Sequence, residues 1–211
     1  MARRSAGTRR SATDVSLEDR AARTRLTSSP LMATFDPTPE VELGTLDDSA
    51  LEQLVVHAVP DAALEEVMPV APGPARWTHA RLQAFIAFHR GRRGGLQGPA
   101  REVSFVIRVD GEAAGVVRLQ RVSPATFVVG LWLARSVRSR GVGHLALVAV
   151  ADRALVLGAR ALVAETTAGN APALATLKRL GAHIQRASET GAVHAELDLT
   201  RFAAEHRSAA P

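Results

Sequence analysis

Three short runs of β-forming residues, joined by turns too short to hold a helix, constrain the fold of this chain more than any other feature. The first run, residues 103–109, leads into Asp110-Gly111, a dipeptide typical of two-residue hairpin turns. Residues 114–120 form the second run, Ser123-Pro124 marks the next turn, and residues 127–133 form the third run. Because strands joined by such short connections run in opposite directions, the sequence predicts an antiparallel meander.

After the meander, the pattern changes to alternating helices and strands. Apolar residues at helical spacing predict a helix over residues 143–157, and a buried strand is predicted over residues 161–166. A second helix over residues 170–180 follows, and a last strand over residues 193–199 is expected to pair with residues 182–187. A meander followed by βα units gives a mixed sheet that is neither purely parallel nor purely antiparallel.

Two helices are predicted ahead of the meander. Asp47-Asp48-Ser49 precedes apolar residues at helical spacing from Leu51 to Ala58, and Thr78 is a capping residue for a helix that reaches His89. The predicted order is therefore α-α-β-β-β-α-β-α-β-β, an α+β fold built on a mixed α/β sheet.

The chain divides into a leader, one folded domain and a short tail. Residues 1–40 are rich in arginine and serine and have no hydrophobic period, which predicts a disordered leader. A start at Met32, with the preceding residues outside the natural protein, is the alternative. The patterned domain spans residues 41–200, and residues 201–211 are expected to form a C-terminal tail.

Composition and charge exclude several functional classes. The chain has no cysteine, which excludes disulfides and thiolate chemistry, and no apolar run reaches the roughly 20 residues needed to cross a membrane. The net charge is +5, and residues 1–30 contribute +4 of it, with seven arginines against three acids. Nucleic-acid binding is therefore not expected outside the leader, and a cytoplasmic location fits the composition. No cluster has the spacing of metal ligands, so no metal is expected.

The segment between the third run and the next helix has the composition of a phosphate-binding turn. It holds Arg135, Arg138 and Arg140, whose side chains can form charge-assisted hydrogen bonds to an anion. Gly141 and Gly143 have no Cβ atom, so the backbone can approach a ligand closely. The first amides of the following helix lack partners within the helix and lie at the positive end of its dipole. These features predict a site for a pyrophosphate.

The same turn has other interpretations. Residues 141–146 fit the dinucleotide pattern G-x-G-x-x-A, with Glu165 following at a suitable distance. However, arginines and serines precede Gly141 where a buried strand would run, and only 46 residues follow Glu165, too few for the remaining βα units. A Walker loop needs Gly-Lys-Ser/Thr, and Lys178 is the only lysine. A glycine-rich turn without a ligand stays open as the structural alternative.

Residues 131–143, Leu-Trp-Leu-Ala-Arg-Ser-Val-Arg-Ser-Arg-Gly-Val-Gly, resemble the acetyl-CoA motif of the GNAT family of N-acetyltransferases. The core of that motif is Arg/Gln-x-x-Gly-x-Gly/Ala, which Arg138, Gly141 and Gly143 fill. Residues 165–181 resemble the second cofactor motif of the family, through an asparagine near its start and a closing Leu-Gly. The chain is most similar to the subgroup that acetylates the N-termini of ribosomal proteins.

The resemblance implies a GNAT-type acyl-CoA N-acyltransferase fold with acetyl-CoA as cosubstrate. It implies that the backbone amides of Leu131 and Leu133 contact the thioester carbonyl, where the third meander strand diverges from its neighbour. It also implies that Asn170 contacts the pantetheine arm. Seven consecutive residues would hold the pyrophosphate through their backbone amides: Arg138, Ser139, Arg140, Gly141, Val142, Gly143 and His144.

Three positions depart from the family pattern. Leu177 stands where a tyrosine often protonates the leaving thiolate, Ala173 replaces a common serine, and Ala182 replaces the usual phenylalanine. The chain has no tyrosine at all, so the sequence assigns no general acid. A thiol with a pKa of about 8.5 can leave without strong acid help, so activity is still expected.

Glu165 is the predicted general base, because a neutral amine is needed for attack and a carboxylate at a strand end can accept the proton. The resemblance implies a glutamate base at the same place in ribosomal N-terminal acetyltransferases. An ordinary exposed glutamate is the alternative. Glu102 is a weaker candidate, and His79 and His89 on the second helix are interpreted as packing or surface residues.

The sequence thus predicts an N-acetyltransferase that moves an acetyl group from acetyl-CoA to a primary amine by direct attack in a ternary complex. The acceptor is expected to be a small molecule or a protein N-terminus, and the enzyme a monomer or homodimer. A non-catalytic module that binds or senses acyl-CoA is the alternative, which Leu177 and Ala173 favour.

Overall fold

The computed structural model describes residues 38–68, 76–186 and 191–207. Most of the expected leader and the end of the expected tail lie outside these ranges. Seven strands are found in the described part of the chain: β1 (Val41–Thr45), β2 (Glu102–Val109), β3 (Glu112–Arg121), β4 (Thr126–Leu133), β5 (Ala161–Thr167), β6 (His183–Arg186) and β7 (Ala192–Asp198). The α-helices are α1 (Asp48–Gln53), α2 (Leu64–Val67), α3 (His79–Arg90), α4 (Val142–Val156), α5 (Ala171–Arg179) and α6 (Leu199–Arg207). A π-helical turn, η1 (Leu54–Ala58), continues α1, and two short 3-10 turns are η2 (Gly95–Gln97) and η3 (Arg135–Val137).

The strands form one mixed sheet in the order β1-β2-β3-β4-β5-β7-β6. β4 and β5 pair in parallel, and each other pair in this sheet is antiparallel. The predicted meander is confirmed as β2, β3 and β4. Asp110 and Gly111 both have positive φ, 53° and 87°, as a two-residue hairpin turn requires. The predicted βα units and the closing pair of strands are confirmed as well, which makes this an α+β fold.

Besides the short helix α2 and the 3-10 turns, two elements at the ends of the domain, β1 and α6, were not predicted. β1 adds an edge strand to β2, from Val41 opposite Val109 to Thr45 opposite Phe105. Its five residues lack a clear alternation, and only the pairing with β2 reveals the strand. α6 begins at Leu199 and extends the folded part beyond residue 200, because Phe202 is 1% exposed and lies in the core.

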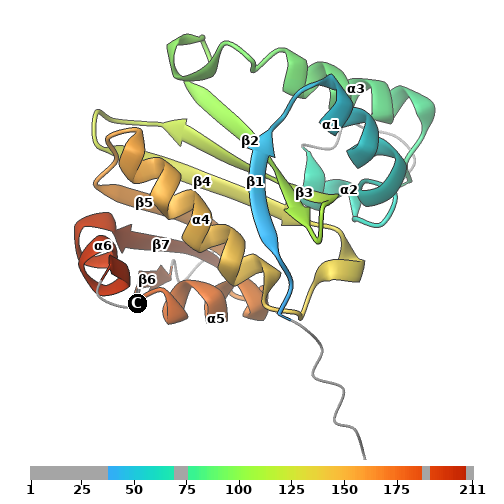
Figure 1. Cartoon of the computed structure of the whole chain (residues 1–211). Helices are drawn as coiled ribbons and strands as arrows, with labels where there is room; N and C mark the ends of the chain where they lie inside the picture. Colours follow the sequence, from blue (N-terminus) through green and yellow to red (C-terminus); the bar gives the residue numbers. More distant parts are fainter. Residues whose placement is uncertain (1–37, 69–75, 187–190, 208–211) are drawn as a thin grey trace, which may run out of the picture. The chain divides into compact units, whose positions relative to one another are not determined.

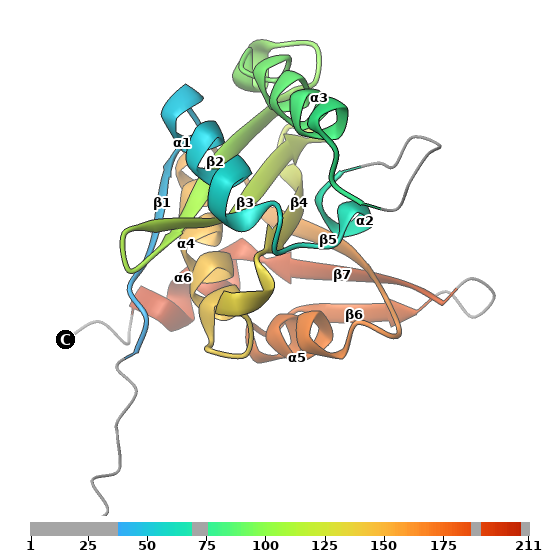
Figure 2. The ribbon, with the colours of Figure 1, turned by 90° about the vertical axis from the view of Figure 1, so that its right-hand side faces the viewer.

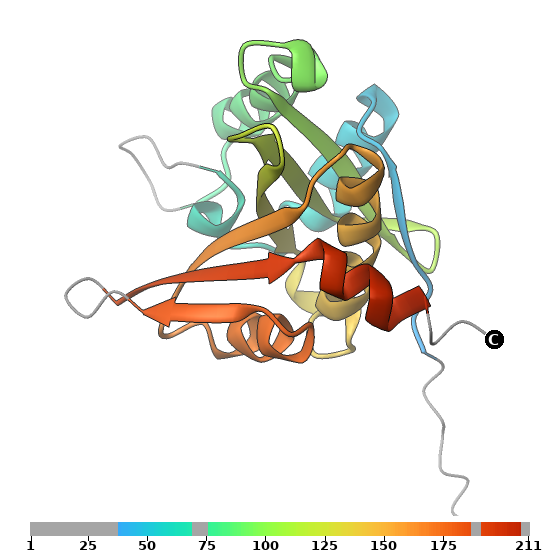
Figure 3. The same cartoon turned by 90° about the vertical axis from the view of Figure 1, so that its left-hand side faces the viewer.

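Each face of the sheet carries its own apolar core. Phe127 and Val129 of β4 pack with Ala146 and Val150 of α4 in one cluster, to which α6 also contributes. Trp132 of β4 belongs to the other cluster, which contains residues of α1, η1 and α3. Figures 2 and 3 show α4 and α6 on one side of the sheet and α2 and α3 on the other. The alternation of side chains along each strand therefore decides which core a residue joins.

The parallel pairing of β4 and β5 stops before either strand ends. The last paired residues are Val129 and Ala164, although β4 continues to Leu133 and β5 to Thr167. On its other edge β4 stays paired with β3 as far as Leu133. β4 and β5 therefore diverge at their carboxyl ends, within the sheet drawn in Figure 1.

Candidate active site

The turn before α4 has the backbone conformation that its glycines allow. Gly141 is the N-cap of α4 and lies in the left-handed region with φ of 82°, and Ser139 has φ of 64°. A left-handed residue is costly for anything but glycine, so the position of Gly141 depends on its missing Cβ atom. The turn thereby directs the start of α4 toward the carboxyl end of β4.

Only part of the predicted amide set is free in the structure. The amide of Arg138 donates to the carbonyl of Arg135 (3.1 Å), and the amide of His144 donates to the carbonyl of Gly141 (3.0 Å). Among the described residues, no acceptor is bonded to the five amides from Ser139 to Gly143. These five amides sit at the positive end of a 15-residue helix, the arrangement that suits a phosphate oxygen.

The guanidinium of Arg138 is held within the chain. Its Nε and Nη2 donate to the carbonyl oxygen of Leu133 at 3.0 and 2.7 Å, and Nη1 and Nη2 donate to the carboxylate of Glu66 at 3.2 and 2.6 Å. The side chains of Arg138 and Glu66 are 37% and 40% exposed. Hydrogen bonds from Arg138 hold the pKa of Glu66 below its usual range. The composition of the turn predicts that this side chain binds phosphate, whereas the structure places it between α2 and the end of β4.

A second contact ties the same turn to the segment before α2. The carbonyl oxygen of Asp61 accepts from the amide of Arg135 (3.1 Å), and its carboxylate accepts from the amide of Ser136 (2.7 Å). The hydrogen bonds from Ser136 lower the pKa of Asp61. Asp61 and Glu66 were missed by sequence reasoning, and no local signal identifies them, because their partners lie more than 70 residues away.

The remaining residues of the predicted cofactor site are placed as follows. Arg140 forms an ion pair with Asp110 (3.3 Å). His144 is half-buried, and burial, followed by the charges of Arg179 and His206, lowers its pKa, so its ring is neutral near pH 7. Asn170 is the N-cap of α5, and its side-chain oxygen accepts from the amide of a following residue at 3.3 Å.

Leu131 and Leu133 lie where β4 and β5 diverge. The amide of Ala134 donates to Ala114 on β3, so alternation along an antiparallel strand turns the amides of Leu131 and Leu133 away from β3. That direction is the side from which β5 has departed. Arg138 takes the carbonyl of Leu133, so the amides of Leu131 and Leu133 and the carbonyl of Leu131 are the backbone groups that face the opening.

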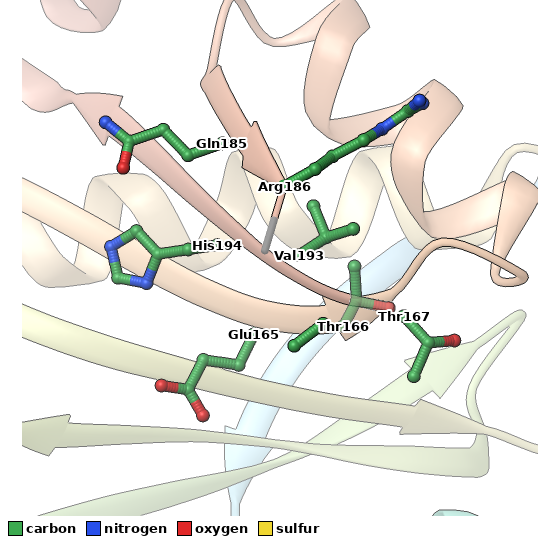
Figure 4. Close-up of a pocket in the computed structure, with 8 residues that line it drawn as sticks. Glu165, Thr166, Thr167, Gln185, Arg186, Val193 and His194 are labelled. Atoms are coloured by element: carbon green, nitrogen blue, oxygen red, sulfur yellow. The ribbon is translucent and has the colours of Figure 1, made fainter. Parts of the chain in front are cut away.

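Glu165 lies on β5, one residue beyond the last pair with β4. It is exposed and stands opposite His194 of β7, which in turn stands opposite Gln185 of β6. Figure 4 shows the three side chains extending to the same side of the strands. A surface pocket of about 610 Å³ includes all three in its lining. The predicted base is therefore accessible at the edge of a hollow in the surface.

The weaker candidates are engaged elsewhere or buried. Glu102 is 4% exposed and pairs with Arg118 (3.1 Å) and Arg92 (3.5 Å), so it is not a free base. His89 is 4% exposed, and burial, followed by the charges of Arg118 and Arg92, lowers its pKa to about 4. His79 is exposed at the first turn of α3. Within the described ranges no three His, Asp or Glu side chains gather closely enough to hold a metal ion, and no described helix has the length and apolar character of a membrane span.

Comparison with known proteins identifies the class that this fold and site define. Residues 41–183 match the family model described as acetyltransferase (GNAT) domain. The chain therefore belongs to the GNAT acetyltransferase family and is an acyl-CoA-dependent N-acetyltransferase.

Solved structures share the fold at low sequence identity. The GNAT domain of PAT from S. lividans is 22% identical, with a TM-score of 0.55, and the match covers 76% of this chain and 90% of that one. RimL, a ribosomal alpha-N-protein acetyltransferase in complex with coenzyme A, is 18% identical with a TM-score of 0.58, covering 75% and 93%. RimJ of Mycobacterium smegmatis, in complex with CoA-disulfide, is 17% identical with a TM-score of 0.59, covering 79% and 89%. The comparison with curated proteins gave no match.

Proposed function

We propose that this enzyme transfers an acetyl group from acetyl-CoA to the primary amine of a small molecule or a protein N-terminus, with Glu165 as the general base. The observation that carries the proposal is the divergence of β4 from β5 after Val129 and Ala164. It leaves an opening with the backbone of Leu131 on one strand and the carboxylate of Glu165 on the other. The five free amides before α4 lie beyond the end of the same strand, β4.

Each part of this arrangement has a role in direct transfer. The amides from Ser139 to Gly143 bind the pyrophosphate, and the amide of Leu131 donates to the thioester oxygen as negative charge develops there. The protonated amine gives one proton to Glu165, and the neutral amine attacks the thioester carbon. A carbon–nitrogen bond forms, the carbon–sulfur bond breaks, the thiolate of coenzyme A leaves, and the second proton of the nitrogen passes to the thiolate or to water. Leu177 has a hydrocarbon side chain, buried in the packing of α5, and supplies no proton to the thiolate; a thiol pKa of about 8.5 allows departure without one.

Two of the solved structures with this fold are RimL, described as a ribosomal L7/L12 alpha-N-protein acetyltransferase, and RimJ, in complex with CoA-disulfide. At 18% and 17% identity they support the fold rather than the acceptor. A protein N-terminus stays part of the proposal because of the resemblance in the cofactor motifs.

Release of free thiol from acetyl-CoA in the presence of an amine panel tests the proposal. Glu165→Gln is expected to lower kcat/KM by about 10²–10⁴-fold, the usual contribution of a general base, while the Kd for coenzyme A changes less than about twofold. Glu196→Gln is the matched control, because Glu196 is an exposed residue of β7, next to β5, and its substitution removes the same charge. Tight coenzyme A binding without thiol release on any amine would favour the non-catalytic module instead. No binding at millimolar coenzyme A would refute the cofactor site itself.

A further inference from the structure

Polar residues form one row across the sheet at the place where β4 and β5 diverge. Ser104 pairs with Arg118, Arg118 pairs with Gly130, and Glu165 pairs with His194. Gly130 and Glu165 are the first residues beyond the last β4–β5 pair, so they flank the opening from its two sides. The members of this row, called the cross-sheet row below, are Ser104, Arg118, Gly130, Glu165, His194 and Gln185.

All members of the row lie on one face of the sheet. The strand residues next to them face the core beneath α4: Val117 and Val129 belong to it, and Ala164 packs against it. Alternation therefore turns the cross-sheet row to the opposite face, the one that α1 and α3 cover over the meander. Over β5, β7 and β6 this face carries exposed Glu165, His194 and Gln185.

Arg118 extends along the row toward the opening. Its Nη1 donates to Glu102 (3.1 Å), and a Cβ atom added to Gly130 would lie 3.2 Å from its Nη2. The guanidinium therefore lies over Gly130, close to where the Cβ atom of a larger residue would stand. Its side chain is 35% exposed, and among the described residues Nη2 has no hydrogen-bond acceptor. An arginine nitrogen thus remains available beside the opening.

The charges around Arg118 leave a surplus of one positive charge. Arg92 and Arg118 share the buried carboxylate of Glu102, which gives two cations against one anion. His89 packs nearby within electrostatic reach of both arginines and is neutral at pH 7 because of its lowered pKa. Glu165 on the far side of the opening is the nearest carboxylate along the cross-sheet row. One side of the opening is therefore cationic and the other anionic.

We propose that the acceptor is a primary amine that carries a carboxylate a few bonds away, with Arg118 binding the carboxylate and Glu165 receiving the amine. This inference rests on the proposed function. Gly130, under the Arg118 guanidinium, and Glu165 each directly follow the last β4–β5 pair, so groups held at these two places are joined by a short skeleton. A guanidinium binds a carboxylate through two parallel hydrogen bonds, and it repels acceptors that bring a second cation, such as polyamines. A free α-amino acid and a peptide with an acidic first residue share the required chemistry.

Paired acceptors that differ in one carboxylate test the inference, with thiol release as the readout. Alanine against alaninamide represents the free amino acid, and C-terminally amidated peptides that begin with Asp or Asn represent the acidic N-terminus. For each pair, the kcat/KM of the acceptor with the carboxylate is divided by that of its amide. In the pair that resembles the natural acceptor, this ratio is expected to be about 10–100-fold lower in Arg118→Gln than in the wild type. Comparing ratios between variants cancels the different amine pKa values of the two acceptors.

Matched variants separate carboxylate binding from loss of structure. Arg121→Gln is the control, because Arg121 lies on the same strand but faces the other way, toward the carbonyl of Leu157 (3.4 Å), and its ratio should stay as in the wild type. Arg118→Lys keeps a cation beside Glu102 and loses the planar fork, so it folds as the wild type does and lowers the ratio partly. Glu102→Gln raises the net charge of Arg92, Arg118 and residue 102 together from +1 to +2, and it is expected to raise the ratio of kcat/KM for acid and amide.

The outcomes distinguish this inference from the proposed function. An unchanged ratio in both Arg118 variants, with amide acceptors still turned over, would overturn the carboxylate-bearing acceptor and leave the enzyme proposal intact. Absence of thiol release with every acceptor would overturn both.

Discussion

Glutamine in place of Glu66 removes the charge that holds Arg138 against the end of β4. Two hydrogen bonds, at 2.6 and 3.2 Å, join the guanidinium to the carboxylate, and both side chains are more than one-third exposed. Exposed ion pairs contribute about 0.2–1 kcal/mol, and charged hydrogen bonds with good geometry contribute more. A loss of about 1 kcal/mol from the ordered turn is therefore expected, which corresponds to about fivefold weaker binding of any ligand that needs this turn.

Isothermal titration with coenzyme A measures this effect. Glu66→Gln is expected to raise the Kd about fivefold, whereas Glu65→Gln should leave it unchanged. Glu65 is the matched control, because it lies on the same short helix, is exposed and changes the net charge equally. Thermal unfolding of both variants shows whether the loss is confined to the turn.

The direction of the change separates two roles of Arg138. If its guanidinium binds phosphate directly, release from Glu66 frees it for the ligand and the Kd falls. If it holds the carbonyl of Leu133 and thereby the turn, as the structure shows, the Kd rises. Tighter binding by Glu66→Gln would refute the structural role of Arg138. Arg138→Glu weakens binding under both roles and therefore tests only that the turn belongs to the cofactor site.

Three further predictions concern the frame of the site. Gly141→Ala places a Cβ atom on a residue with φ of 82°, so it should cost about 1–2 kcal/mol of stability and weaken coenzyme A binding, as urea unfolding and titration will show. Gly115→Ala would bring a Cβ atom to 2.2 Å from the carbonyl oxygen of Trp132. Its free energy of unfolding should therefore fall further than that of Gly111→Ala, whose added Cβ atom meets nothing within 4 Å. Equal losses would contradict the close approach of β3 and β4. The pKa of His89 is about 4 in the folded chain, against an ordinary value of 6.5. As the pH falls, the unfolded chain therefore binds the proton first, so stability that is present above pH 6.5 is lost between pH 6.5 and 4. The loss attributable to this residue is about 2 kcal/mol at pH 5, and His89→Phe should lack it; parallel pH profiles of the two proteins would contradict a buried neutral ring.

The sequence by itself determined the features that depend on neighbouring residues. The meander was predicted from apolar alternation and from Asp110-Gly111. The bounds of β2, β3 and β4 agree with the predicted runs to within a few residues. The glycine-rich turn was also readable, because positive φ at Gly141 and unpaired amides at a helix start are local properties. Glu165 was placed at a strand end for the same reason; in the structure it is exposed and lies two residues before β5 ends at Thr167.

Tertiary structure alone decided how distant residues meet. β1 became a strand only by pairing with β2, and α6 joined the fold through the buried ring of Phe202. Glu66 and Arg138 are 72 residues apart, and no periodicity links an acidic residue on one helix to an arginine in a later turn. The position of Arg118 over Gly130 depends on strand register, which the hydrophobic pattern and the turns fix only when the whole sheet assembles. Local sequence thus set the conformation of each element, and long-range pairing set which charges face the opening between β4 and β5.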